Sequence, residues 1–323
     1  MSLLLVAGCT RSGTTLLSRA LNRHPDIFVA PETQFFTKIW SQRRLVRDRT
    51  SKAYAARAAD ILEACEYPEL GLFRTHRTAI EGALTGQPNL HRQFLALLSA
   101  LSEKAPILAE KTPWHTPLSL SILAAHPTAR LLAIVRHPAA TVASVRGKAS
   151  FRRVSNVLQC SARWMLMNRA VLDAVDTLGP ERAMLVRYED LILEPGNTLA
   201  GICRFLGIAP DAQMETPGFS DSSHPGLVQA SAQFDPGRTE LWRSVLSPED
   251  QKKVLQLTAP LARKFGYDVP FETASLAGKA ALEAEIALQS AGVWLMRLGV
   301  YPFGGLVGPS VISQAQGLKT PSP

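Results

Sequence analysis

The sequence of 323 residues is poor in cysteine and has no long apolar run. Its four cysteines are scattered without the C-x-x-C spacing of a structural zinc site or a disulfide framework. A chain of this length that is 46% hydrophobic can bury a large core, so we expect neither disulfide nor metal. The cysteine pattern favours a reducing compartment. With no membrane-spanning run and no basic segment before a signal core, we expect a cytoplasmic protein.

Acidic residues are in the minority, 27 against 35 basic ones, which gives a formal net charge of +8. This balance favours anionic ligands but does not say which. No lysine-rich block or repeated basic-aromatic pattern is present, which argues against a nucleic-acid partner.

The first loop lacks a lysine that its surroundings lead one to expect. An apolar run at 3–6 opens into Gly-Cys-Thr-Arg-Ser-Gly-Thr-Thr at 8–15, and a helical pattern follows. A strand, a glycine turn and a helix start can close backbone N–H groups on a phosphate, with threonine hydroxyls as further donors. The segment nearly fits the nucleoside-triphosphatase pattern G-x-x-x-x-G-K-[ST], but Thr14 stands at the lysine position.

A carboxylate for magnesium at the end of a second strand is missing as well. The apolar run 131–135 ends in Arg136-His137-Pro138, so a cation replaces the carboxylate. Arg11 brings another cation into the first loop, where a guanidinium can contact two anionic oxygens. These residues predict a metal-free anion site. The simpler alternative is a glycine turn with a solvated arginine.

Strand and helix patterns alternate along the chain. Strands are expected near 3–7, 107–109, 131–135 and 183–187. Helices are expected near 14–23, 52–65, 91–103, 116–125, 138–147, 156–177, 197–206, 248–265 and 275–298. The alternation predicts an α/β fold, P-loop-like, with a mostly parallel central sheet and helices on both faces. In such sheets ligands bind at the carboxyl ends of the strands.

Two regions outside these motifs also invite predictions. We expect a domain over 1–270 and a C-terminal helix and tail over 271–323. The helix has an apolar stripe, which suits packing on its own domain, a homodimer, or peripheral contact with a membrane. The segment from about 210 to 240 is rich in Pro, Gly, Ser and Asp and predicts a long loop reaching the site. Ser247 is expected to cap the helix that begins at Pro248.

Four further segments accompany the first loop. They are Pro31-Glu32-Thr33, Glu110-Lys111-Thr112-Pro113, Arg136 with Ser144, and Arg187-Tyr188-Glu189-Asp190-Leu191. Together they make the chain resemble the sulfotransferases that use 3′-phosphoadenosine 5′-phosphosulfate (PAPS), in the branch that contains tyrosylprotein sulfotransferases and many bacterial relatives. The resemblance covers roughly residues 1–265 and rests on about forty positions.

The resemblance implies PAPS as the sulfuryl donor, without a metal. It assigns the donor's 5′-phosphosulfate to Arg11, Ser12, Gly13, Thr14 and Thr15. Arg136 and Ser144 match the residues that hold the 3′-phosphate; an arginine at a strand end and a serine two turns into the next helix can converge on one dianion. Tyr188 matches a tyrosine beside the nucleotide, and Arg238 a basic loop residue over the 3′-phosphate. Helix capping and turn roles are the alternatives.

The resemblance also implies a general base. In the small-molecule branch a histidine lies two residues beyond a lysine, but here Pro113 holds that place after Lys111. Glu32 matches the glutamate of the tyrosylprotein branch, so it is the expected base, with Arg11 and Lys111 stabilising charge on the leaving phosphate. A guanidinium does not give up its proton, whereas Lys111 is either an electrostatic partner or a proton donor. His115 is the rival base, or else a structural histidine before a helix.

The acceptor is expected to be a hydroxyl or amine of a carbohydrate, lipid, peptide tyrosine or small metabolite. Its cleft should adjoin Glu32 near Gln34, Phe35, Phe36 and the region of Trp40, although these rings suit the core equally. Four arginines form a cluster for an acidic acceptor or a solvated helix face: Arg43, Arg44, Arg47 and Arg49. The alternatives to sulfuryl transfer are a metal-dependent P-loop phosphotransferase and a nucleotide-binding protein without catalysis.

Overall fold

The computed structural model describes residues 2–39, 48–66, 70–102, 104–147, 156–217 and 234–297. Within these residues, parallel strands form one five-stranded sheet in the order β2-β3-β1-β4-β5. The strands are β1 (Ser2–Gly8), β2 (Ile27–Ala30), β3 (Ile107–Glu110), β4 (Arg130–Val135) and β5 (Ala183–Arg187). Because every strand runs the same way, the loops that follow them share one edge of the sheet.

Strand β2 is the one strand of the described chain that the sequence patterns did not predict. It is four residues long, as is β3, so periodicity is a weak signal for either strand. It lies at the edge of the sheet, where its outer backbone groups need partners. The Asn22 amide supplies them: its Nδ2 donates to the Val29 carbonyl at 3.2 Å, and the Val29 N–H donates to Asn22 Oδ1 at 2.6 Å.

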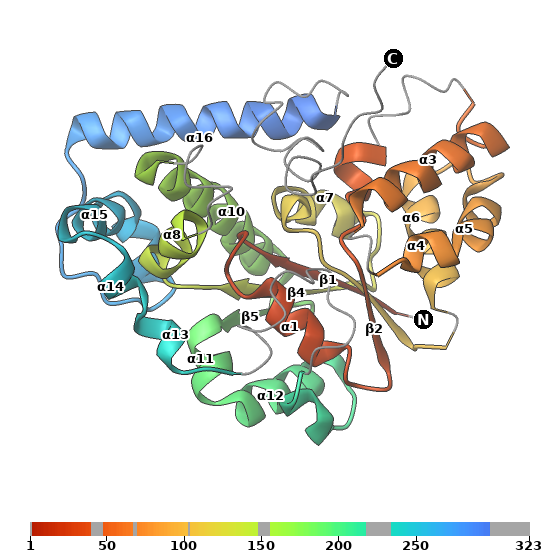
Figure 1. Ribbon diagram of the computed structural model, residues 1–323, viewed down its shortest axis with the longest axis horizontal. Helices are drawn as coiled ribbons and strands as arrows, with labels where there is room; N and C mark the ends of the chain where they lie inside the picture. The colour runs from red at the N-terminus through yellow and green to blue at the C-terminus, as the bar shows by residue number, and fades with distance from the viewer. Residues whose placement is uncertain are drawn as a thin grey trace, which may run out of the picture.

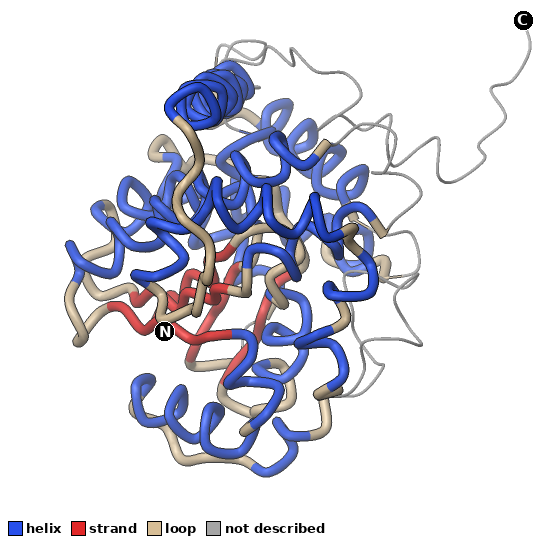
Figure 2. Tube along the Cα trace, turned by 90° about the vertical axis from the view of Figure 1, so that its left-hand side faces the viewer, coloured by secondary structure: helices blue, strands red, loops and turns tan. Residues whose placement is uncertain are grey.

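Helices cover both faces of the sheet, which confirms the predicted α/β architecture (Figures 1 and 2). One face carries α1 (Thr14–Leu21), α11 (Tyr188–Leu193) and α12 (Pro195–Leu206). The other carries α7 (Ser119–Ala124), α8 (Pro138–Arg146), α10 (Val157–Leu178) and α15 (Pro248–Lys264). Along β1, Leu3 and Leu5 join one core while Leu4 and Val6 join the other, because successive strand side chains point to opposite faces.

A group of helices between β2 and β3 lies beside the β2 edge (Figure 1). It consists of α3 (Lys52–Cys65), α4 (Leu72–Thr75), α5 (Arg77–Leu84) and α6 (Leu90–Leu101). Short elements complete the described fold: η1 (Phe35–Ile39, π-helical), η2 (Pro113–Leu118) and η3 (Ala212–Glu215), both 3₁₀, and α13 (Gly237–Glu240) and α14 (Trp242–Val245). Helices α4, α5, α11, α13 and α14 were not predicted.

The C-terminal helix α16 (Leu276–Arg297) lies along α10 (Figure 1). Its Leu282, Ile286 and Val293 are buried in the same core as α10, which is the contact expected of packing on its own domain. The boundary near 270 and a role in dimerisation stay predictions, and the tail from 298 lies outside the described residues. No helix among the described residues has the length and apolarity to cross a membrane. The Ser247 cap is confirmed, since its side chain accepts the Asp250 N–H.

Candidate active site

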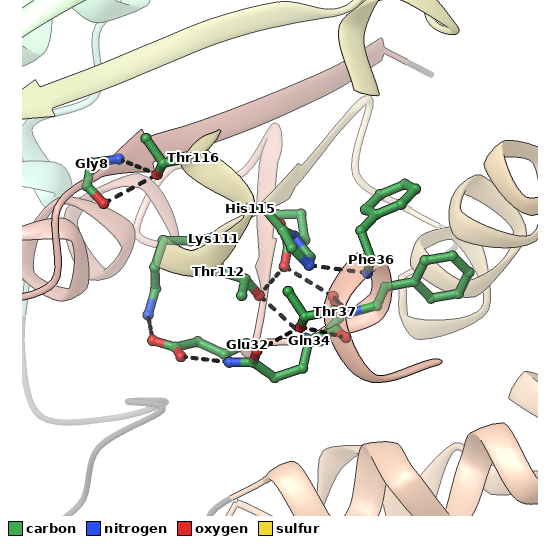
Figure 3. Close-up of polar contacts among 12 residues, drawn as sticks. Gly8, Glu32, Gln34, Phe36, Thr37, Lys111, Thr112, His115 and Thr116 are labelled. Atoms are coloured by element: carbon green, nitrogen blue, oxygen red, sulfur yellow. Dashed lines mark hydrogen bonds and ion pairs between the residues drawn. The ribbon is translucent and has the colours of Figure 1, made fainter. Parts of the chain in front are cut away.

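The first loop joins β1 to α1 through a tight, partly left-handed turn. Gly13 has a φ of 95°, and a Cβ there would lie 2.3 Å from Cδ2 of Tyr188, so the tyrosine ring packs directly on the glycine. Arg11 has a φ of 72°, which is uncommon outside glycine and typical of functional turns. At the start of the loop, Thr116 Oγ1 accepts the Gly8 N–H at 2.9 Å and lies 3.2 Å from the Gly8 carbonyl (Figure 3). Contacts with Tyr188 and with Thr116 therefore fix the turn before α1.

The residues predicted for the donor's phosphates come together around this loop. Arg11 Nε donates to Ser144 Oγ at 3.1 Å, although the two are far apart in the chain. Arg136 donates to the backbone carbonyls of Arg11 at 3.3 Å and Arg238 at 2.8 Å, and its guanidinium lies 4.1 Å from the centre of the Tyr188 ring. Burial lowers the pKa of Arg136, as expected for a cation that is withdrawn from water. The first loop and the end of β4 therefore lie in contact with residues of α8, α11 and α13.

Several polar atoms on this side have no hydrogen-bond partner within the described chain. They are Thr10 Oγ1, the buried Ser12 Oγ and Arg136 Nε. Buried polar atoms are paired in most proteins, so an unpaired set around an anion-cradling turn needs an explanation. A bound phosphate or sulfate would supply acceptors for all three.

The end of β4 is supported by a second set of contacts. The His137 N–H donates to Glu189 Oε1 at 3.0 Å, and the hydroxyl of Tyr267 donates to Glu189 Oε2 at 2.7 Å. The His137 ring stacks on Trp242 with centroids 4.8 Å apart. Burial lowers the pKa of His137 to about 4, so the ring is neutral at physiological pH.

Glu32 lies just beyond β2, and its carboxylate points toward Lys111 and Gln34 (Figure 3). Its Oε1 is 2.6 Å from Nζ of Lys111, which follows β3 and is 1% exposed, whereas the Glu32 side chain is 23% exposed. Gln34 Nε2 contacts the other carboxylate oxygen at 3.4 Å. The parallel pairing of β2 with β3 places these residues together, since Ala30 is level with Glu110.

Both ring nitrogens of His115 are engaged. Nδ1 lies 2.9 Å from Oε2 of the buried Glu110, and Nε2 accepts the Phe36 N–H at 3.1 Å. Since an imidazole nitrogen that accepts a hydrogen bond carries no proton, Nδ1–H donates to the carboxylate and the ring is neutral. The imidazole is 1% exposed. This geometry matches the structural alternative for His115.

The residues expected near the acceptor have mixed placements. The side chains of Phe35 and Phe36 are buried in the core. Trp40 lies outside the described residues, as do 43, 44 and 47 of the arginine cluster. Gln34, which was expected to line the acceptor cleft, contacts Glu32. Glu110 and Thr116 were given no functional role, because their contacts join segments that no local pattern brings together. The described residues contain no group of three or more His, Cys, Asp or Glu side chains suited to a metal ion.

A glycine turn between the first strand and helix of a parallel sheet, with basic residues at the neighbouring strand ends, defines a P-loop-like α/β protein. The sequence profile of the sulfotransferase family matches residues 4–212. The chain belongs to the sulfotransferase family, which confirms the resemblance seen in the motifs.

Individual relatives agree with this assignment. The chain is 25% identical over 211 residues to protein-tyrosine sulfotransferase of Drosophila melanogaster, a match covering 64% of this chain and 38% of that protein. It is 26% identical over 297 residues to the nodulation protein NoeE of Sinorhizobium fredii, covering 84% and 67%. The chain therefore spans well under half of the Drosophila protein.

The fold also matches solved structures. The sulfotransferase domain of the Synechococcus PCC 7002 olefin synthase has a TM-score of 0.60 at 24% identity, covering 84% of this chain and 96% of that one. The sulfotransferase domain of the curacin biosynthetic pathway has a TM-score of 0.61 at 19% identity, covering 83% and 99%. At these identities the likeness concerns the fold.

Proposed function

We propose that this protein is an enzyme that transfers the sulfuryl group of PAPS to a hydroxyl or amine acceptor, with Glu32 as the general base. The observation that carries the proposal is the pairing of Glu32 with the buried Lys111 at 2.6 Å, beside the first loop. A proton acceptor and a cation are the two groups that sulfuryl transfer needs around the reacting sulfur. Membership of the sulfotransferase family supports the reaction class.

PAPS fits the residues in and around the first loop. Backbone and side-chain donors of 11–15 would bind the 5′-phosphosulfate, and the unpaired Ser12 Oγ lies in this turn. Arg136 and Ser144 would bind the 3′-phosphate, with Arg238 above it and Tyr188 beside the nucleotide. Arg11 already contacts Ser144, so the two phosphate subsites share one hydrogen-bonded group. PAPS, when bound, supplies the sulfuryl group and a phosphate leaving group.

The chain's own groups account for the proton and charge changes of the transfer. The acceptor oxygen forms a bond to sulfur, its proton passes to Glu32, and the bond between sulfur and the bridging oxygen breaks. Negative charge then develops on the leaving phosphate, where Arg11 and Lys111 stabilise it. The engaged nitrogens of His115 support Glu32 rather than His115 as the base.

The acceptor enters beside Lys111. A cavity of about 320 Å³ lies there between α1 and β2, lined among others by Thr15, Ser18, Phe28 and Leu72. This volume is at the lower end of the range for pockets that hold small organic molecules, so it suits a small metabolite or a single inserted side chain. The α1 side of the cavity presents polar residues such as Thr15, Ser18 and Asn22, and β2 contributes apolar residues such as Phe28.

Calorimetric titration with adenosine 3′,5′-bisphosphate, 5′-AMP and ATP, each with and without magnesium, tests the donor. We expect metal-independent binding that requires the 3′-phosphate and weakens roughly 10-fold to 100-fold in Arg136→Ala, because a buried charge-assisted contact is lost. Magnesium-dependent ATP binding without preference for the 3′-phosphate contradicts the proposal and indicates a phosphotransferase. Donor binding without turnover of any acceptor indicates a non-catalytic protein.

A further inference from the structure

Three consecutive backbone N–H groups just after Glu32 donate to side chains instead of to the backbone. Gln34 N donates to Thr112 Oγ1 at 3.3 Å, Phe35 N to Thr33 Oγ1 at 3.2 Å, and Phe36 N to His115 Nε2 at 3.1 Å. Gln34 directly precedes η1 and Phe35 and Phe36 begin it, and the N–H groups at the start of a helix lack intrahelical partners. Side chains from two separate segments therefore hold this turn.

All three acceptors are in turn bound by one carboxylate. Glu110, at the end of β3, is fully buried. Its Oε1 accepts from Thr33 Oγ1 at 2.9 Å and from Thr112 Oγ1, and its Oε2 accepts from His115 Nδ1 at 2.9 Å. Because each of these groups gives its proton to Glu110, each turns a lone pair toward a backbone N–H. One ionised carboxylate thereby sets the direction of six hydrogen bonds.

The ionised form of Glu110 agrees with its surroundings. Its two oxygens accept from three donors, Thr33 Oγ1, Thr112 Oγ1 and Nδ1–H of His115, and hydrogen bonds to the charged form of a carboxylate favour that form. A protonated Glu110 would have to reverse one of its three bonds, and that acceptor would then lose its lone pair for the turn. A buried polar network of this kind specifies one arrangement when every member is satisfied.

The network ends on both oxygens of Glu32. Gln34 has a φ of 50°, a left-handed conformation that persists in a non-glycine residue only where neighbours impose it. In that conformation Gln34 Nε2 reaches Glu32 Oε2, and Gln34 Oε1 accepts from Thr37 Oγ1 at 2.9 Å. Lys111, the residue after Glu110, contacts Glu32 Oε1. Figure 3 shows the Glu32 carboxylate between Lys111 and Gln34.

We propose that Glu110 is a positioning residue for the general base, acting through Thr33, Thr112 and His115 on the turn that carries Gln34. The proposal rests on the role of Glu32 given above. It assigns His115 a function in the reaction without proton transfer to the acceptor. It also explains why an acidic residue is buried directly beside the cationic Lys111.

Thr112 offers the sharpest test, because its hydroxyl can be removed at nearly constant shape. We expect Thr112→Val to lower kcat roughly 10-fold to 100-fold with the donor KM within about twofold, since misplacing a reacting group by about 1 Å is that costly. Thr112→Ser keeps the oxygen and should retain activity within a few-fold. The matched control is Thr258→Val, an equally buried threonine in α15 whose hydroxyl bonds Val254 O, and it should leave kcat unchanged.

A second measurement separates this proposal from the proposed function. Amide hydrogen exchange of residues 34–36, followed without any substrate, should speed up in Thr112→Val and in Thr33→Val but not in Thr258→Val. Unchanged exchange, or faster exchange with an unaltered kcat, overturns the positioning role. High activity of Glu32→Gln overturns the proposed base instead, while the exchange result still reports on the network.

A double-mutant cycle tests the route through Gln34. If Thr112 acts by orienting Gln34, the Gln34→Ala and Thr112→Val losses in kcat will not multiply, and the double variant will be about as active as the slower single variant. Fully multiplicative losses contradict that route.

Discussion

The proposed site has a donor side, around the first loop (8–15) and Arg136, and a base side, around Glu32 and Glu110. The two sides differ in how the hydrogen-bonding groups of their side chains are satisfied. On the donor side, Thr10 Oγ1, Ser12 Oγ and Arg136 Nε have no hydrogen-bond partner within the described chain. On the base side, the buried carboxylate of Glu110 accepts hydrogen bonds from Thr33, Thr112 and His115. Each of these three side chains also accepts a backbone N–H of the turn after Glu32. The proposed donor side therefore has polar atoms that remain without a partner in the described chain, whereas the polar atoms around Glu110 are satisfied within the protein.

This difference separates binding from positioning. A cradle with unpaired donors gains its hydrogen bonds when the ligand arrives, so its stability should depend on the ligand. A closed network holds its geometry beforehand, which is what a group that must meet a reacting proton needs. Substitutions on the donor side should therefore mainly change ligand binding, and those on the base side should mainly change kcat.

The largest effect is expected for Glu32→Gln. Removal of the base should lower kcat by about 10³-fold, within the usual range for general-base catalysis. Binding of adenosine 3′,5′-bisphosphate should stay within about threefold, because the donor side is untouched. Turnover assays with calorimetry on the same preparation provide the check. If Glu32→Gln kept nearly full activity, Glu32 would not be the general base.

Gly13→Ala should cause the largest loss of stability on the donor side. A Cβ at Gly13 would meet the Tyr188 ring at 2.3 Å, in a backbone conformation with φ of 95°. We expect the free energy of unfolding to fall by about 2–4 kcal/mol, measured by urea denaturation. Gly86→Ala is the matched control, since Gly86 has a φ of 78° with no atom within 4 Å of the added Cβ. It should cost only about 1 kcal/mol. Equal losses would show that the tyrosine contact is unimportant.

Stability should fall in acid because of His137. Burial lowers its pKa from 6.5 to about 4, so between these values the unfolded chain binds a proton that the folded protein does not. The free energy of unfolding should therefore decrease as the pH falls through this window, by at most about 3 kcal/mol. Denaturation of the ligand-free protein at several pH values measures the slope. His137→Gln should flatten it, and an unchanged slope would assign the effect to other groups.

The smallest effects compare the two sides directly. Thr33→Val should lower the free energy of unfolding of the ligand-free protein by about 1–2 kcal/mol, because it leaves the Phe35 N–H and Glu110 short of partners. Ser12→Ala removes an unpaired hydroxyl, so it should change that free energy by less than about 0.5 kcal/mol while weakening adenosine 3′,5′-bisphosphate roughly tenfold. The opposite pattern would mean that the sides have been assigned the wrong way round.

Most of the fold could be predicted, because long elements carry strong periodicity. The strands around 131–135 and 183–187 and the helix 157–178 were predicted within about a residue or two, and the Ser247 cap was predicted at the residue. Strand β2 and the short helices α4, α5, α11, α13 and α14 escaped, since elements of four to eight residues show a period only weakly. The helix expected at 116–125 is a 3₁₀ turn followed by α7, a difference that side-chain spacing cannot show.

The site could be predicted only in part. Residues next to glycine turns and strand ends were found because local sequence marks them, as with Arg11, Lys111 and Arg136. Glu110 gave no such signal: it stands beside Lys111 as one more polar residue at a strand end. Its importance comes from Thr33 and His115, which lie in other segments and reach it only in the folded chain.

The sequence by itself determined the alternation of strands and helices, the glycine turn at 8–15 between β1 and α1, and membership of the sulfotransferase family, because each of these depends on neighbouring residues in the chain. The tertiary structure alone decided which groups are left unpaired for a ligand and which are satisfied within the protein. Hydrogen bonds between β2, β3 and η2 depend on strand order and register, and these follow from packing of the whole sheet rather than from any local segment.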